Sequence, residues 1–95
     1  MPAAHVLLTE LLAKADPGAT GALWRLDGAA RQLDANVVRV RPGARGDAYV
    51  EHDLDVLLLV VEGRGTLHRG ATDEELAPGT LVFVPRGEPR AVSAG

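Results

Sequence analysis

Short runs of alternating apolar and polar residues make up most of this chain, and glycine and proline separate them. The amino-terminal pattern differs, because apolar residues recur there at helical spacing until Asp16-Pro17-Gly18 ends the pattern. The apolar positions are Leu7, Leu8, Leu11, Leu12 and Ala15. This spacing predicts one amphipathic helix over residues 3–15, followed by strands over residues 22–94.

Two strands are predicted directly after the helix, at residues 22–26 and 31–41. The second alternates, but both of its faces mix apolar and polar side chains; Val37, for example, shares a face with Arg39. Such a strand fits either the wall of a partly polar cavity or the edge of a sheet with solvated ends. We favour the edge.

Residues 48–56 alternate more regularly and predict a strand with distinct faces. His52 falls on the apolar face, and Glu51, Asp53 and Asp55 fall on the other. A slip of one residue would bury three carboxylates, which costs more than burying the apolar set. We therefore predict that His52 points inward and that the three acids form a solvated outer face.

An unbroken run of valine and leucine covers residues 56–61, as in a strand covered on both faces, and it is predicted to be the most buried strand. Glycine turns separate the later runs, where His68 lies beside a turn and is predicted to be exposed. The later predicted strands cover residues 66–69, 72–76, 80–84 and 91–94. Short strands at about 8–12-residue spacing are typical of a sandwich or small barrel.

Composition limits the function of this fold. The 95 residues suffice for a single domain, residues 1–95, and the formal net charge of -3 gives no basic surface for nucleic acid. No run approaches the roughly 20 apolar residues of a membrane span, so no membrane partner is predicted. The chain has no cysteine, which excludes disulfides and thiolate chemistry and favours a cytoplasmic location.

Two stretches carry a family resemblance: PGARGDAYVEHDLDVLLLVVEGRGTL at residues 42–67 and GTLVFVPRGEPRAV at residues 79–92. Gly63 is the last residue of the motif within the first stretch. In the second stretch the motif positions are Gly79, Pro85 and Gly87. This spacing resembles the paired motifs of the cupin family. The resemblance implies an all-β double-stranded β-helix, or jelly-roll, barrel, here preceded by one amino-terminal α-helix.

The resemblance also implies where a cupin metal would be held. Counting back from Gly63 places the ligands of the first motif at Val50, His52 and Val56, and the histidine of the second motif at Arg90. Only His52 is a metal ligand by type, and metal sites of this kind generally need about three protein ligands. The sequence therefore predicts no metal and no other cofactor.

A longer spacing of the first motif is the alternative. With a bulge, Tyr49 or Glu51 would turn inward. Arg90 would still place a permanent positive charge where the cation should lie, so we favour the shorter spacing.

Arg90 and His52 are the predicted ligand-binding residues. A guanidinium is always charged, so it must be paired or reach solvent. In one interpretation Arg90 binds a carboxylate with its planar fork, and His52 is a second contact. In the other, Arg90 turns to solvent or pairs with Asp34, Asp47 or Glu88.

No catalytic residue is predicted, because Ser93 has no histidine in an obvious supporting position. The favoured function is metal-free binding of a small anionic molecule in the barrel. The alternatives are a cupin enzyme, using an unforeseen metal site or His52 as acid or base, and a structural module that dimerises. We expect a homodimer, because the chain stops soon after beginning a strand and so leaves a sheet edge; the same observation fits a truncated chain.

Overall fold

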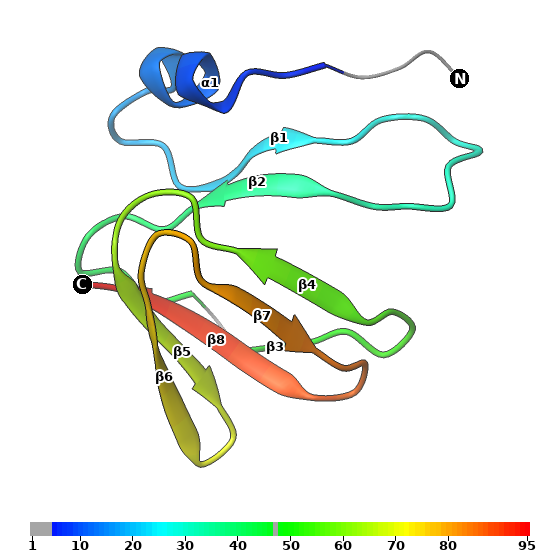
Figure 1. The fold of residues 1–95 in the computed structure, drawn as a ribbon, viewed down its shortest axis with the longest axis vertical. Helices are drawn as coiled ribbons and strands as arrows, with labels where there is room; N and C mark the ends of the chain where they lie inside the picture. Colours follow the sequence, from blue (N-terminus) through cyan, green and yellow to red (C-terminus); the bar gives the residue numbers. More distant parts are fainter. Residues whose placement is uncertain (1–4, 47) are drawn as a thin grey trace. The chain divides into compact units, whose positions relative to one another are not determined.

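The computed structural model describes residues 5–46 and 48–95 as a β-rich chain with one short helix (Figure 1). The chain divides into two compact units, the first ending at Arg41 and the second beginning at Pro42. The first two residues of the predicted helix, and Asp47, lie outside the described residues. No helix in the described part is long and apolar enough to cross a membrane.

The first unit contains helix α1 (Leu8–Lys14) and strands β1 (Gly21–Arg25) and β2 (Asn36–Arg39). The helix begins later than predicted because Leu7, at its N-cap, has an extended backbone and no capping side chain. β1 and β2 pair antiparallel, with a bulge between Ala22 and Trp24. Among the described residues β2 pairs with β1 alone, which confirms the edge interpretation.

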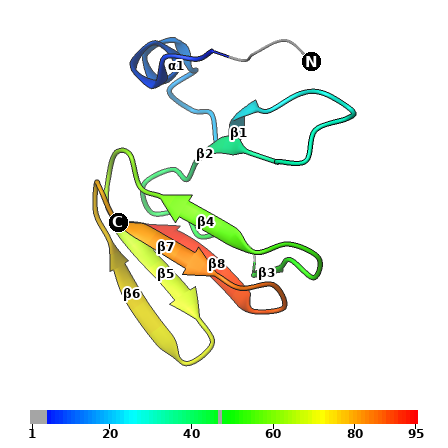
Figure 2. The same cartoon turned by 45° about the vertical axis from the view of Figure 1, so that its right-hand side comes forward.

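The second unit contains six strands in two antiparallel layers. β3, β8, β5 and β6 form a sheet in that order, and β4 and β7 form a two-stranded ribbon that packs against it, with strands running along nearly the same line as β8 (Figures 1 and 2). Their bounds are β3 (Tyr49–Val50), β4 (Val56–Leu59), β5 (Gly65–Arg69), β6 (Thr72–Leu76), β7 (Leu81–Val84) and β8 (Pro89–Ala94). β8 is paired on both sides, so the last strand is not itself an edge.

The core of this unit lies between the sheet and the ribbon. Leu67 and Leu76 come from the sheet and Val82 and Val84 from the ribbon, and all four are buried. The half-buried side chains packed against them are Val56, Leu58, Val60 and Val92. This apolar layer between two sheets confirms the predicted all-β fold.

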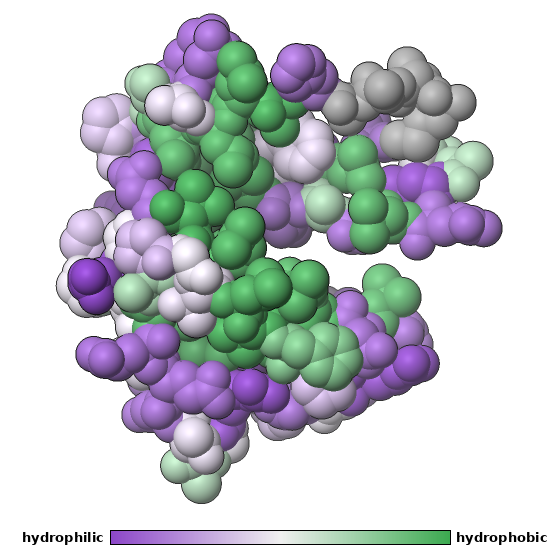
Figure 3. Space-filling model, viewed as in Figure 1, coloured by the Kyte–Doolittle hydropathy of each residue, from purple (hydrophilic) through white to green (hydrophobic). Residues whose placement is uncertain are grey.

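The prediction that residues 56–61 form the most buried strand is wrong. Inward side chains of β4 reach the core, but Leu57 and Leu59 on its other face are 65% and 60% exposed. They lie directly opposite Phe83 and Leu81 of β7, which are 55% and 59% exposed. Figure 3 shows hydrophobic surface gathered over β4 and β7. The unbroken apolar run therefore reflects one covered face and one open apolar face.

The single strand predicted over residues 48–56 is interrupted. β3 ends at Val50, and the chain bends where the Glu51 carboxylate accepts a hydrogen bond from the backbone N–H of Asp53 (3.0 Å). The N–H of Gly87 donates to the carbonyl of Glu51 (2.6 Å), and the N–H of Arg86 donates to the Asp55 carboxylate (3.0 Å). These bonds tie the bend to the β7–β8 turn.

Candidate ligand-binding site

Arg90 lies on the inner face of the four-stranded sheet. Val92 packs against the core, and side chains two residues apart on a strand share a face, so Arg90 of β8 faces the same side. Tyr49 of β3 is directly opposite Arg90. The Cζ atom of Arg90 lies 4.9 Å from the centroid of the Tyr49 ring, a cation–π contact worth about 0.5–1 kcal/mol at an exposed site.

The Nη1 atom of Arg90 is buried and has no hydrogen-bond partner among the described residues. Two of the acids predicted to pair with Arg90 are engaged elsewhere: Asp34 with Arg31, and Glu88 with Arg69. The third, Asp47, lies outside the described residues. A buried donor without an acceptor costs about 1–3 kcal/mol, so this nitrogen marks a place where an acceptor would be strongly favoured.

Arg69 lies on the same face of the sheet and differs from Arg90, because the nitrogens of its guanidinium have partners. Its Nε donates to the Glu88 carboxylate and its Nη2 to the carbonyl of Phe83 (3.2 Å), while Nη1 lies 3.4 Å from Glu74. The hydrogen bond from Arg69 lowers the pKa of Glu88, and the same bond raises the pKa of Arg69. Arg69 is therefore a structural cation, whereas Nη1 of Arg90 has no acceptor within residues 5–46 and 48–95.

Glu51 completes the surroundings of Arg90. Its Oε2 accepts a hydrogen bond from the Tyr49 hydroxyl (3.1 Å), and its Oε1 accepts the bond from Asp53. The Asp53 N–H, and then the Tyr49 hydroxyl, lower the pKa of Glu51, and the bonded carboxylate raises the pKa of Tyr49. Glu51 is half-buried, so the prediction that it belongs to a solvated outer face is wrong.

His52 lies in the bend after β3, and its side chain is exposed. The prediction that it points inward is wrong, because the alternation of β3 does not continue past Glu51. Tyr49, rather than Val50, shares the inner face with Arg90, so the backbone follows the longer motif spacing. The ligand-binding role of His52 stays a prediction.

With the longer spacing of the first motif, the four cupin metal positions fall on Tyr49, Glu51, Val56 and Arg90. A valine has no donor atom, and the guanidinium of Arg90 is itself a cation. Within residues 5–46 and 48–95 no three histidine, cysteine, aspartate or glutamate side chains gather as a metal-binding group. The residues present do not fit a divalent cation.

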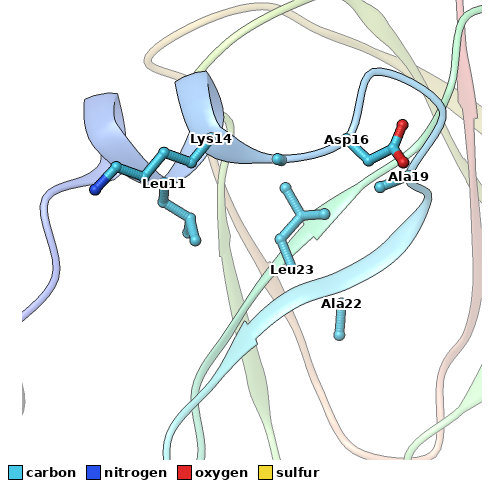
Figure 4. A pocket seen from close by; sticks show the side chains of 7 residues that line it. Leu11, Lys14, Asp16, Ala19, Ala22 and Leu23 are labelled. Atoms are coloured by element: carbon cyan, nitrogen blue, oxygen red, sulfur yellow. The ribbon is translucent and has the colours of Figure 1, made fainter.

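An open depression of about 330 Å³ lies in the first unit, between α1 and β1 (Figure 4). Leu11 and Leu23 extend into it from the two elements, and Lys14 and Asp16 are its charged residues. The remaining lining residues are Ala15, Ala19 and Ala22. Both charged residues are exposed, so the depression offers no convergent polar groups to orient a ligand.

A second polar constellation was missed by sequence reasoning. His68 is half-buried rather than exposed, and its ring nitrogens lie within hydrogen-bond distance of Asp73 and Ser93. The prediction that Ser93 lacks a supporting histidine is therefore wrong. These residues are separated in the chain and meet only through strand pairing.

Three glycines of the cupin motifs are present in this chain although most of the metal-ligand residues are not. Their backbone conformation explains why glycine is needed at these positions. Gly63, Gly79 and Gly87 have φ angles of 83°, 88° and 81°, in the left-handed region that favours glycine. The turns and the two packed β-layers are consistent with an all-β fold of the jelly-roll class. A family model described as Cupin domain matches residues 36–94, more than half of the chain. The chain belongs to the cupin family.

Neither the comparison with curated proteins nor the comparison with solved structures gives a match.

Proposed function

We propose that this cupin binds a small carboxylate through Arg90, without a metal. The observation that carries the proposal is the buried Nη1 of Arg90, which lacks an acceptor among the described residues. A carboxylate accepts two parallel hydrogen bonds from a guanidinium fork, the geometry that makes arginine the preferred partner of such groups.

Of the two neighbours of Arg90, Tyr49 favours binding of a carboxylate and Glu51 limits the charge of the ligand. The Tyr49 ring packs against the guanidinium and restricts its plane, which lowers the entropy lost on binding. Glu51 contributes a negative charge beside Tyr49, with both oxygens already engaged. A second carboxylate on the ligand would be repelled by Glu51, so we expect monocarboxylates to bind more tightly than dicarboxylates.

Dimerisation is a second candidate function, favoured by the open face of the β4–β7 ribbon. Leu57, Leu59, Leu81 and Phe83 form an uncharged apolar surface there. Among the described residues β4 and β7 pair only with each other, so each has a free outer edge. A second copy offers the same apolar face and the same edges, which suits an isologous contact.

A thermal-shift panel of mono- and dicarboxylates on the whole chain tests the ligand proposal. We expect one or more monocarboxylates to raise the unfolding temperature in a concentration-dependent manner, because a ligand that binds only the folded state stabilises it. Arg90→Gln should abolish the shift, whereas Arg64→Gln, in the exposed turn before β5, should retain it. No shift with any carboxylate, or an equal shift in Arg90→Gln, would refute the proposal.

A further inference from the structure

Three polar side chains from neighbouring strands form a chain of hydrogen bonds on the four-stranded sheet. Oγ of Ser93 (β8) lies 2.8 Å from Nε2 of His68 (β5), and Nδ1 of His68 lies 2.9 Å from Oδ1 of Asp73 (β6). Leu67, next to His68, is buried in the core, so His68 faces the opposite, outer side. The cluster therefore lies on the other face of the sheet from Arg90.

Strand register holds these residues together. His68 is directly opposite Asp73, and Ser93 is opposite Thr66, two positions before His68 on the same face. Ser93 is thus a diagonal neighbour of His68, within reach of its ring. Because the three strands form one sheet, the arrangement does not depend on a loop.

The partners of the imidazole define its tautomer. An ionised carboxylate only accepts hydrogen bonds, so with Asp73 ionised the Nδ1 of neutral His68 carries the hydrogen. Its Nε2 is then free to accept the proton of the Ser93 hydroxyl. This is the connectivity of a nucleophile, a general base and an orienting acid.

Strand pairing also brings a basic residue opposite Ser93. Arg45 is directly opposite Ser93 in an antiparallel bridge, which places both residues on one face of the sheet. A guanidinium there would stabilise negative charge developing on a carbonyl oxygen attacked by Ser93. Ser93 and His68 are half-buried and Asp73 is exposed, so the site opens at the surface and suits small substrates.

We propose that Ser93, His68 and Asp73 form a nucleophilic site that cleaves small, activated carboxylic esters. Oγ of Ser93 attacks the carbonyl carbon while its proton passes to Nε2 of His68. The bond to the alcohol oxygen breaks, and the alcohol leaves with that proton. Water then attacks the acyl-serine, gives a proton to His68, and releases the acid as Ser93 recovers its proton. The reaction needs no oxidant or cofactor.

A fluorophosphonate probe tests this site on the whole chain, because it labels activated serines covalently. Ser93 is the single serine of the sequence, so its peptide is identified directly by mass spectrometry. We expect one label on Ser93 and none in Ser93→Ala. His68→Gln should slow labelling by about 10²–10⁴-fold, the usual contribution of a general base.

Two further variants keep the test independent of folding defects. Asp73 is exposed, so Asp73→Asn should fold normally by circular dichroism and still label more slowly, because the amide no longer fixes the tautomer. His5→Gln changes an exposed histidine in the first unit and should label at the wild-type rate. An unlabelled Ser93, wild-type labelling in His68→Gln, or an equal loss in His5→Gln would overturn the proposal.

Discussion

The guanidinium of Arg90 rests on the ring of Tyr49, with 4.9 Å between Cζ and the ring centroid, while its Nη1 is buried without an acceptor among the described residues. The Tyr49 ring therefore stabilises the cation, while the part of the chain that the structure describes supplies no acceptor for Nη1. Most buried polar groups have a hydrogen-bond partner, so a buried donor without one calls for a specific explanation.

Arg90→Met should therefore raise the unfolding temperature of the ligand-free protein. The change removes a buried unsatisfied donor, worth about 1–3 kcal/mol, and forfeits a cation–π contact worth about 0.5–1 kcal/mol. In a domain of this size each kcal/mol corresponds to about 4–8 °C. Differential scanning calorimetry without ligand measures the change. A marked fall in unfolding temperature would show that Arg90 is a structural residue.

Tyr49→Phe should raise the pKa of Glu51. The Tyr49 hydroxyl donates to the Glu51 carboxylate and stabilises its ionised form, so its removal moves the pKa back toward the ordinary value of 4.5. The Asp53 N–H still donates, so we expect a partial return. Carbon-13 NMR titration of the carboxyl groups measures it, with Asp55 as an internal control because its pKa is lowered chiefly by the backbone of Arg86. An unchanged Glu51 titration would contradict the hydrogen bond.

The Arg69–Glu88 pair should contribute to stability at neutral pH and lose that contribution in acid. The pKa of Glu88 in the folded state lies below its ordinary value of 4.5, so the unfolded chain binds the proton first as pH falls. The contribution is complete above about pH 4.5 and disappears as pH falls through the folded-state pKa.

Glu88→Gln should accordingly lower the unfolding temperature at pH 7 and flatten its decline as the pH falls from 7 to below about 4.5. Thermal melts across this range measure the effect. Glu75→Gln changes an exposed glutamate of β6 and is the matched control. Parallel curves for Glu88→Gln and the wild type would exclude the pair as a source of acid sensitivity.

Gly65→Ala should destabilise the protein by about 1–3 kcal/mol through overpacking. A Cβ at position 65 would overlap the carbonyl oxygen of Ser93, which belongs to backbone and has little freedom to move. Gly46→Ala is the control, since its Cβ would lie 3.6 Å from the carbonyl of Val92, an ordinary contact. Chemical denaturation of both variants provides the comparison, and equal stabilities would contradict the close approach of β5 and β8.

A charge on the open ribbon face should weaken self-association without unfolding the protein. Leu57→Glu changes a side chain that is 65% exposed, so we expect monomer stability to change by no more than about 0.5 kcal/mol. Analytical ultracentrifugation over a concentration series measures association. Ala71→Glu, in the exposed turn between β5 and β6, serves as the control. A monomer at all concentrations in the wild type would rule out the dimer proposal.

Strand positions were largely predictable because turn residues and short apolar runs are local signals. The predicted run at 72–76 coincides with β6, and the runs at 66–69 and 80–84 agree with β5 and β7 to within one residue at each end. The open face of β4 was not predictable, because periodicity does not say whether an apolar face is covered. The prediction for His52 failed for a related reason: the Asp53 N–H donates a hydrogen bond to the Glu51 carboxylate, and the resulting bend ends the alternation.

The candidate sites depended on which strands become neighbours. Arg90 was identified from the motif frame, but its contact with Tyr49 requires β3 to lie beside β8. His68 and Ser93 lie 25 residues apart and meet through the β5–β8 register. Neither the β3–β8 pairing nor the β5–β8 pairing can be read from a local sequence pattern. The sequence therefore indicated candidate residues but not the residues that they contact.

The most direct test of the central claim observes Arg90 itself. Nitrogen-15 NMR of the arginine Nε–H groups, with the Arg90 resonance assigned by its absence in Arg90→Gln, reports hydrogen bonding to that side chain. We predict that the monocarboxylate selected by the thermal-shift panel shifts the Arg90 resonance in a saturable manner and leaves Arg69, already bonded to Glu88, nearly unchanged. Saturable binding with no shift at Arg90 would contradict the account.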